Sequence, residues 1–393
     1  MKKNSKMEKH IEMRKNNTVE NSAMEEEAYR YWIGSIPNLR ANKINAILEY
    51  FGSPKEVYNA SICALEDMIK VSNMNGIAIM EGDLEATIKG RDMDLLIKNL
   101  EYLKNHGIKF VTMLDDSYPD KLRNIYDPPF LLYYKGNPLP DKKKIISIVG
   151  ARECSIYGKE TAKYLASALA REDITIISGL ARGIDSYAHM GALSSEGITY
   201  GIMGCGIDIC YPAENIKLYM DIQAKGGIIS EYGPGIKPLA YHFPMRNRII
   251  SALSDGILVI EAKEKSGSLI TVDMGLDQGK NIYAVPGRIT DKLSKGCNNL
   301  IKMGAKVVTS PKDILEDFLE YFNSGDDQLK LTGILDSSEQ AIYDILTLSP
   351  MHIEDIVSIT GFDLGEIMEY LLSMELKDII SQPFKNYYTR RPV

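Results

Sequence analysis

The sequence has few cysteines, and their spacing matches no common metal or redox motif. Five cysteines are scattered along 393 residues, their number is odd, and no Cys-x-x-Cys occurs. This argues against both a disulfide framework and a zinc site. A reducing compartment suits such a chain best, so we expect a cytoplasmic protein.

Long apolar runs are also missing. No stretch of 18 or more apolar residues occurs, so we expect no membrane-spanning helix and no membrane partner. The Lys-rich first 17 residues are not followed by an apolar segment, which argues against a secretory signal. Residues 1–25 are polar and patternless, and we predict a disordered tail there.

Signatures of catalysis are scarce. No G-x-x-x-x-G-K-[ST] occurs, and the Gly-rich segment 201–208 lacks the spacing of a dinucleotide-binding loop. His189 and His242 lie near informative loops without an assignable serine and acid, and His189 is better explained as a packed residue. Glu231 and Glu261 end two expected strands, but each is isolated as a candidate base or metal ligand. We therefore expect no enzyme activity, no cofactor and no metal.

An excess of positive charge is absent too. The formal net charge of −7 argues weakly against a nucleic-acid partner. The order of the charges matters more than their sum. Residues 237–252 contain three cations and no acid, so basic residues are concentrated locally.

The chain falls into segments of different pattern. Residues 26–106 carry apolar residues at three- and four-residue steps, which predicts a small helical domain. A short strand at 108–113 and a Pro-rich stretch open the next domain, 107–310. Residues 311–334 are expected to form a short helix and a polar linker. Residues 335–393 show three helices and a terminal hairpin, the pattern of a winged helix-turn-helix.

Within the middle domain, short β-branched runs alternate with helix-length segments. This pattern predicts an α/β fold with a doubly wound, mostly parallel sheet covered on both faces. The expected strands are 145–149, 175–177, 199–203, 227–229, 256–260, 281–285 and 306–308. In such sheets ligands bind at the carboxyl ends of the strands, near the switch in strand order.

The loop after the first of these strands combines glycine with arginine. Gly150 would allow a tight turn and a close approach to a ligand. The start of the following helix would offer free N–H groups to an anion, and Arg152 would add further donors. An ordinary strand-to-helix turn with a solvated arginine is the alternative.

The loop after the second strand repeats this combination. Ser178, Gly179 and Arg182 are candidate phosphate ligands at a helix start. Asp185 is placed to cap that helix or to hold Arg182.

The segment after the fourth strand is the most distinctive. Phe243 and Pro244 lead into Arg246, Asn247 and Arg248, so aromatic rings stand next to cations. This pairing suits a nucleic-acid strand, with charge for phosphates and ring faces for bases. Pro244 is expected to begin a helix, which puts both arginines in its first turn, where the dipole disfavours cations. Such a placement favours an anionic ligand, and the alternative is that the arginines bond buried carbonyls.

The fifth strand is followed by Lys265, Ser266, Gly267 and Ser268. A Ser-Gly-Ser turn that opens a helix has the composition of a phosphate-binding nest. It equally suits a plain helix cap.

Taken together, these motifs resemble the DNA processing protein A family, DprA, also called Smf. The resemblance rests on residues 149–152, 178–185, 243–251, 261–262, 266–271, 284–287 and 296–301, which occur in the family's order. The helical front is similar to that family's SAM-like or helix-hairpin-helix domain, and the tail to its winged-helix domain.

The resemblance implies a Rossmann-like fold that binds single-stranded DNA and protects it. It further implies a homodimer that helps to load a RecA-type recombinase during natural transformation. Arg152 would lie in the DNA pocket, together with Gly235, Phe243, Arg246 and Asn247.

Two other classes of function are alternatives for this sequence. Lysine-decarboxylase-like phosphoribohydrolases share a related core, but they carry Pro-Gly-Gly-x-Gly-Thr and a catalytic glutamate where this chain has residues 265–268. A transcription regulator would read DNA through the C-terminal domain. Its expected recognition helix, 363–374, has three acids and no Lys or Arg, so that domain is better suited to a protein or to the other subunit.

Overall fold

The computed structural model describes residues 24–37, 39–140, 143–318, 335–347, 349–377 and 379–390. Residues 1–23 of the predicted 1–25 tail and residues 319–334 of the predicted 311–334 linker lie outside these ranges, and residues 24 and 25 lie in a helix. Two compact units are present: one holds residues up to 135 together with 230–236, and the other holds 136–229 and the residues from 237 on. The domain boundaries expected from the sequence stay predictions.

The first unit is mainly helical. A helix over residues 24–35 precedes α2 (Ala41–Phe51), α3 (Pro54–Asn59), α4 (Ile62–Met74), α5 (Glu81–Lys89) and α6 (Met93–Asn105). Trp32 is buried at its centre, and the hydroxyls of Ser53 and Ser61 cap the helices that follow them. After the helices, β1 (Lys109–Thr112) pairs antiparallel with β2 (Leu131–Gly136), and α7 (Asp120–Arg123) lies between them in sequence.

The main sheet of the second unit contains seven strands among the described residues. They are β3 (Ile145–Val149), β4 (Thr175–Ser178), β5 (Thr199–Met203), β6 (Gly227–Ser230), β7 (Gly256–Val259), β8 (Asn281–Ala284) and β9 (Lys306–Val307). They follow one another in the order β6-β5-β4-β3-β7-β8-β9, and β3 pairs parallel with both β4 and β7. All five residues of β3 are buried, as expected for a central strand covered on both faces. The predicted α/β fold with a doubly wound sheet is confirmed, and each strand lies where the sequence indicates it.

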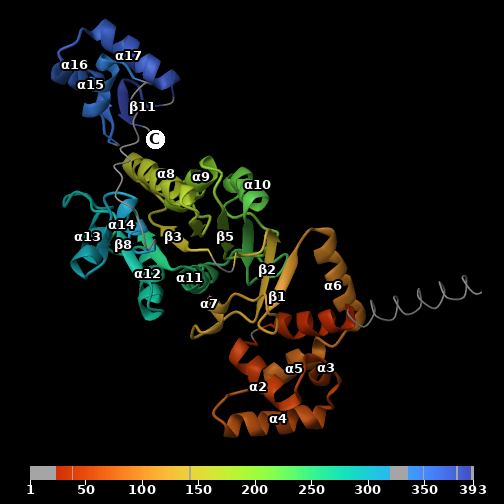
Figure 1. The fold of residues 1–393 in the computed structure, drawn as a ribbon. Helices are drawn as coiled ribbons and strands as arrows, with labels where there is room; N and C mark the ends of the chain where they lie inside the picture. Colours follow the sequence, from red (N-terminus) through yellow and green to blue (C-terminus); the bar gives the residue numbers. More distant parts are fainter. Residues whose placement is uncertain are drawn as a thin grey trace, which may run out of the picture. The chain divides into compact units, whose positions relative to one another are not determined.

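Helices cover both faces of this sheet (Figure 1). They are α8 (Ile156–Arg171), α9 (Ile184–Ser194), α10 (Ile216–Lys225), α11 (His242–Leu253), α12 (Gly267–Asp277), α13 (Lys295–Lys302) and α14 (Lys312–Leu315). Side chains of α8 and α9 form a buried cluster with Ile146 and Ile148 of β3. On the other face, α11 packs against α12, and Gly275 of α12 lies directly over Ile257 of β7. A Cβ at Gly191 would collide with the backbone of α8, so glycine permits the close approach of α8 and α9.

The strand order reverses between β3 and β7. From β3 the chain adds β4, β5 and β6 on one side, and it then returns to place β7 on the other side of β3. Because the loops after β3 and β7 lead away in opposite directions, a crevice opens at the carboxyl ends of these two strands.

The C-terminal residues form a small domain with its own core. It contains α15 (Ser337–Ile345), β10 (Met351–His352), α16 (Ile353–Thr360), α17 (Leu364–Leu376), β11 (Ile380–Phe384) and β12 (Tyr387–Arg390). The three strands pair antiparallel in the order β10-β12-β11, and Ile356, Ile367 and Leu371 are buried beneath them. Three helices with a terminal hairpin make a winged helix, as predicted. No helix in the described part of the chain is long and apolar enough to cross a membrane.

Candidate functional site

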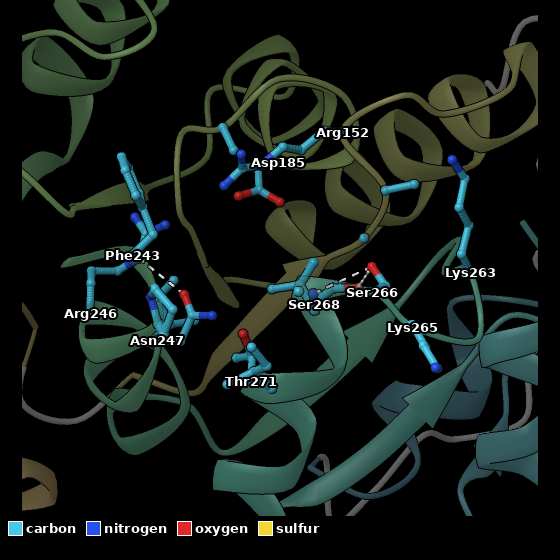
Figure 2. Close-up of a pocket in the computed structure, with 18 of the residues that line it drawn as sticks. Arg152, Asp185, Phe243, Arg246, Asn247, Lys263, Lys265, Ser266, Ser268 and Thr271 are labelled. Carbon is cyan, nitrogen blue, oxygen red and sulfur yellow. Dashed lines mark hydrogen bonds between the residues drawn. The ribbon is translucent and has the colours of Figure 1, made fainter. Parts of the chain in front are cut away.

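A cavity of about 450 Å³ opens at the switch in strand order (Figure 2). Its walls come from the loop after β3, the beginning of α11, the loop after β7 and the first turns of α12. The lining residues are Val149, Gly150, Ala151, Arg152, Glu153, Ala181, Asp185, Phe243, Pro244, Arg246, Asn247, Ile250, Lys263, Lys265, Ser266, Gly267, Ser268, Ile270 and Thr271.

Most of the residues predicted from the sequence meet in this cavity. Nine of them line it: Gly150, Arg152, Phe243, Arg246, Asn247, Lys265, Ser266, Gly267 and Ser268. Five are not part of its lining: Ser178, Gly179, Arg182, Gly235 and Arg248. Glycine is required at position 150, because a Cβ there would lie 2.7 Å from Ile184 and 2.9 Å from the carbonyl of Glu261.

One exposed cation lies over an aromatic ring of the cavity, and two more stand across the cavity from that ring. The guanidinium carbon of Arg152 lies 5.7 Å from the ring centroid of Phe243, a cation–π distance. Neither Arg152 nor Lys265, both exposed, has an ion-pair partner among the described residues. Lys263, which the sequence reasoning missed, has only a long contact of 3.9 Å to the exposed Glu153. Figure 2 shows Lys263 and Lys265 on one side of the cavity and Phe243 on the other.

The beginning of α12 forms another part of the wall. The Ser266 hydroxyl accepts a 3.4 Å hydrogen bond from the Ser268 N–H, and the two hydroxyl oxygens lie 2.8 Å apart. A Cβ on Gly267 would meet no atom within 4 Å, so the space in front of this turn is open. The turn is therefore a helix cap that also faces the cavity, and it presents the positive end of the helix dipole there.

Arg246 differs from the other cations because it is buried. One of its terminal nitrogens donates to the carbonyls of Gly179, at 3.0 Å, and Ile202. Its Nε donates to the side chain of Asn247, at 3.3 Å. Helix α11 begins at His242, before the predicted start at Pro244. For Arg246 the structure thus takes the alternative in which the arginine bonds buried carbonyls, and its side chain ties the ends of β4 and β5 together.

Asp185 lies next to this arginine, and it does not hold Arg182. Its carboxylate accepts a 3.1 Å hydrogen bond from the Gly179 N–H. Burial raises the pKa of Asp185 above its ordinary value, and the nearby charge of Arg246 opposes this effect. The expected pairing with Arg182 is wrong, because exposed Arg182 forms a bidentate ion pair with Glu214. The guanidinium nitrogens donate to the two carboxylate oxygens at 2.7 and 2.9 Å.

Two of the predicted residues outside the cavity lining, Ser178 and Gly179, have structural roles. The buried Ser178 hydroxyl donates to the carbonyl of Ile148, at 2.6 Å. Gly179 has no room for a side chain, since a Cβ would lie 2.6 Å from Arg246. Arg248 is half-buried on α11, and Gly235 has a φ of +78°, which favours glycine.

The N-terminus of α8 is not open to an anion, contrary to the sequence-based expectation. The carboxylate of Glu261 accepts hydrogen bonds from the Ser155 N–H, at 2.8 Å, and the Ser155 hydroxyl, at 2.5 Å. A Cβ at Gly158 would collide with this carboxylate, so the glycine makes room for it. The Glu261 carboxylate therefore occupies this helix end in place of an external anion. Its oxygens are engaged by the hydrogen bonds from Ser155.

His189 is a packed residue, as the sequence indicated. Its Nδ1 lies 2.7 Å from the Thr199 hydroxyl. Burial and the charge of Arg246 lower the pKa of His189 to about 3, so the imidazole is neutral. Within the described ranges, no group of three or more His, Cys, Asp or Glu side chains could hold a metal ion.

Comparison with known proteins identifies the family. A family model described as DNA recombination-mediator protein A matches residues 109–319, and one for the DprA winged helix domain matches residues 331–382. The chain belongs to the DNA recombination-mediator protein A (DprA) family. The DNA processing protein DprA of Streptococcus pneumoniae is 47% identical over 207 residues, which cover 53% of this chain and 73% of that protein. DprA of Bacillus subtilis is 41% identical over 218 residues, with coverage of 55% and 73%.

Solved structures of DprA proteins are similar as well. The X-ray structure of Streptococcus pneumoniae DprA is 38% identical and has a TM-score of 0.64; the match covers 75% of this chain and 99% of that one. DNA processing protein A of Helicobacter pylori is 30% identical, with coverage of 54% and 96% and a TM-score of 0.49, and is described by its single-stranded DNA binding mode.

Proposed function

We propose that this DprA-family chain binds single-stranded DNA in the cavity at the switch in strand order. In this proposal it protects incoming strands and helps to load a RecA-type recombinase during natural transformation. The observation that carries the proposal is the position of exposed Arg152 over the ring of Phe243, with Lys263 and Lys265 on the other cavity wall.

This arrangement suits the two parts of a nucleotide separately. Arg152 and Lys265, which lack an ion-pair partner among the described residues, are available to phosphates, and the start of α12 adds its dipole. The Phe243 ring offers a face on which any base can stack, so recognition would depend little on sequence. A duplex keeps its bases stacked inside, and it therefore cannot use this ring.

The C-terminal domain does not favour duplex binding. Its α17 occupies the place of a recognition helix and carries Glu366, Glu369 and Glu375, with no basic residue before Lys377. Negative charge on this helix would repel the phosphates of a major groove. A regulator that reads duplex DNA through α17 is therefore the weaker candidate.

We further propose that the chain does not turn over nucleotides. The buried carboxylates nearest the cavity, Asp185 and Glu261, already accept hydrogen bonds from the backbone or from Ser155. The loop at 265–268 lacks the Pro-Gly-Gly-x-Gly-Thr of phosphoribohydrolases. Purified protein should release no base from AMP. Cleavage that disappears in Glu261→Gln would favour the enzyme function instead.

Filter binding of matched single-stranded and duplex oligonucleotides at several salt concentrations tests the main proposal. We expect a preference for the single strand and an affinity that falls as salt rises. Arg152→Ala and Lys265→Ala should each weaken binding about ten-fold, the value of one charged hydrogen bond. Arg171→Ala, which removes an exposed cation from the far end of α8, is the control and should bind normally. Equal affinity for duplex and single strand would refute the proposal.

For partners beyond DNA, the support is the resemblance to the family. We propose a homodimer and a functional contact with a RecA-type recombinase. Light scattering on the full chain would measure its mass in solution. The lag before RecA hydrolyses ATP on single-stranded DNA should shorten when the protein is added, and an unchanged lag would argue against recombinase loading.

A further inference from the structure

Two of the family motifs lie on either side of the loop after β8, and neither lines the cavity. Residues 284–287 and 296–301 flank this loop, which runs from 288 to 295. The side chain of Asn298 accepts a 3.1 Å hydrogen bond from the Gly287 N–H and donates a 3.0 Å hydrogen bond to the Gly287 carbonyl. Position 287 has no room for a Cβ, because it would collide with the Ser294 side chain. Both ends of the loop are therefore held in place.

Backbone hydrogen bonds join this loop to the cavity wall. The Ala262 N–H donates to the carbonyl of Leu293, at 2.7 Å, and the Gly296 N–H donates to the carbonyl of Ala262, at 2.9 Å. A Cβ on Gly296 would lie 2.8 Å from the Lys263 carbonyl. The loop after β8 thus lies directly against the loop that carries Lys263 and Lys265.

The loop presents a surplus of exposed positive charge. Arg288, Lys292 and Lys295 are exposed, and among the described residues no carboxylate lies within ion-pair distance of them. Asp291 is the one acid between 288 and 295, so the net charge of this segment is +2 (three cations minus one acid). The formal net charge of the whole chain is −7, so this segment has a net charge of the opposite sign.

The opposite flank of the cavity differs in this respect. On the β4 side the exposed cation is Arg182, and Glu214 neutralises it through two hydrogen bonds. Uncompensated positive charge therefore continues from the cavity toward β8 and not toward β4 and β5. A polyanion attracted to the cavity therefore meets unpaired cations toward β8, whereas beside β4 the charge of Arg182 is neutralised.

We propose that Arg288, Lys292 and Lys295 form an extension of the cavity that binds the phosphates of single-stranded DNA. A strand longer than the cavity runs over the carboxyl ends of β7 and β8 and contacts these side chains through its backbone. This inference rests on the proposed function, since it needs a strand seated in the cavity. It adds a binding surface and assigns the side on which the strand leaves.

Two oligothymidylates test the extension, one of about 6 and one of about 30 nucleotides, within and beyond the site size of a single binding groove. The double variant Lys292→Ala/Lys295→Ala should bind the short oligonucleotide like wild type and the long one more weakly. Its log–log salt slope with the long oligonucleotide should be less negative by about 1.4, or about 0.7 for each of two lost phosphate contacts. The control Arg171→Ala/Lys302→Ala also removes two exposed cations, at the C-terminal ends of α8 and α13.

The outcomes separate the extension from the cavity. If Arg152→Ala weakens both lengths while the Lys292/Lys295 variant changes neither, the extension is wrong and the cavity stands. If the control variant loses as much slope as the test variant, net charge explains the effect and the extension is also wrong. If Arg152→Ala changes neither length, the proposed function itself fails.

Discussion

Replacing Arg246 by methionine should destabilise the protein, although this residue lines the proposed binding cavity. Methionine keeps most of the volume and removes the guanidinium. The carbonyls of Gly179 and Ile202 then lose a buried donor, and the Asp185 carboxylate loses a neighbouring positive charge. Arg246 is only 4% exposed, so water cannot replace it without a rearrangement of the strand ends.

The expected cost is large relative to the stability of a domain. Each buried carbonyl left without its donor costs about 1–3 kcal/mol, and a buried charge left without its partner costs about 3–5 kcal/mol. Because these effects overlap at one site, we expect a loss of at least about 3 kcal/mol. For a unit of this size that corresponds to a fall in Tm of about 6–12 °C. Arg152→Ala, which removes an exposed side chain, should leave Tm nearly unchanged.

The pH dependence supplies an independent check. The folded-state pKa of Asp185 lies above its unfolded value, so its ionisation opposes folding, and this penalty grows as pH rises through the folded pKa. Loss of the Arg246 charge raises that pKa further. The Tm difference between wild type and Arg246→Met should therefore be smaller at about pH 5 than at about pH 7.5. Adding Asp185→Asn to the variant should recover part of the loss.

Calorimetry and DNA affinity measured on the same samples complete the test. A variant that keeps the wild-type Tm but loses DNA binding would refute the structural role of Arg246. It would mean that the guanidinium faces the ligand and not the strand ends.

Three further outcomes follow from individual contacts. Gly158→Ala should lower Tm, because its Cβ displaces the Glu261 carboxylate from the start of α8; an unchanged Tm would contradict this packing. Burial would raise the pKa of Glu339, but the hydrogen bonds that it accepts, above all from Lys377, lower this pKa overall. The stability that ionised Glu339 contributes is therefore lost as pH falls through its folded-state pKa. Lys377→Met should thus make the C-terminal domain less sensitive to acid, as read by hydrogen exchange. DNA affinity should show no titration from His189 near pH 6, since its pKa is about 3; a step there that disappears in His189→Gln would disprove this.

The sheet was predictable because each strand can be recognised from the residues of its own short segment. Each is a short β-branched run between turns, and burial on both faces leaves no polar alternation to obscure it. The start of α11 was less predictable. Proline favours the first helical position, but any position in the first turn tolerates its missing N–H, and here the helix begins at His242.

The cavity was predictable in outline, because its loops follow strands at the switch point. What each cation does there was not. Arg152 and Arg246 both follow glycine- or proline-marked loops, yet one is exposed and the other bonds carbonyls of two different strands. Such partners are distant in sequence, as is Glu261, which accepts hydrogen bonds from Ser155, 106 residues earlier in the chain. Side-chain direction depends on tertiary neighbours, and a single sequence does not specify them.

The resident carboxylate at α8 has a consequence for competition among ligands. A free nucleotide offers only a few phosphate charges, and at this switch point the helix end of α8 is already filled by Glu261. A free nucleotide can therefore use only the start of α12 and a few side chains. A polymer, in contrast, can add one weak contact after another along its backbone, and each linked contact raises the effective concentration for the next. If the chain binds DNA as proposed, closing one of two anion sites would favour a polymeric strand over a free nucleotide.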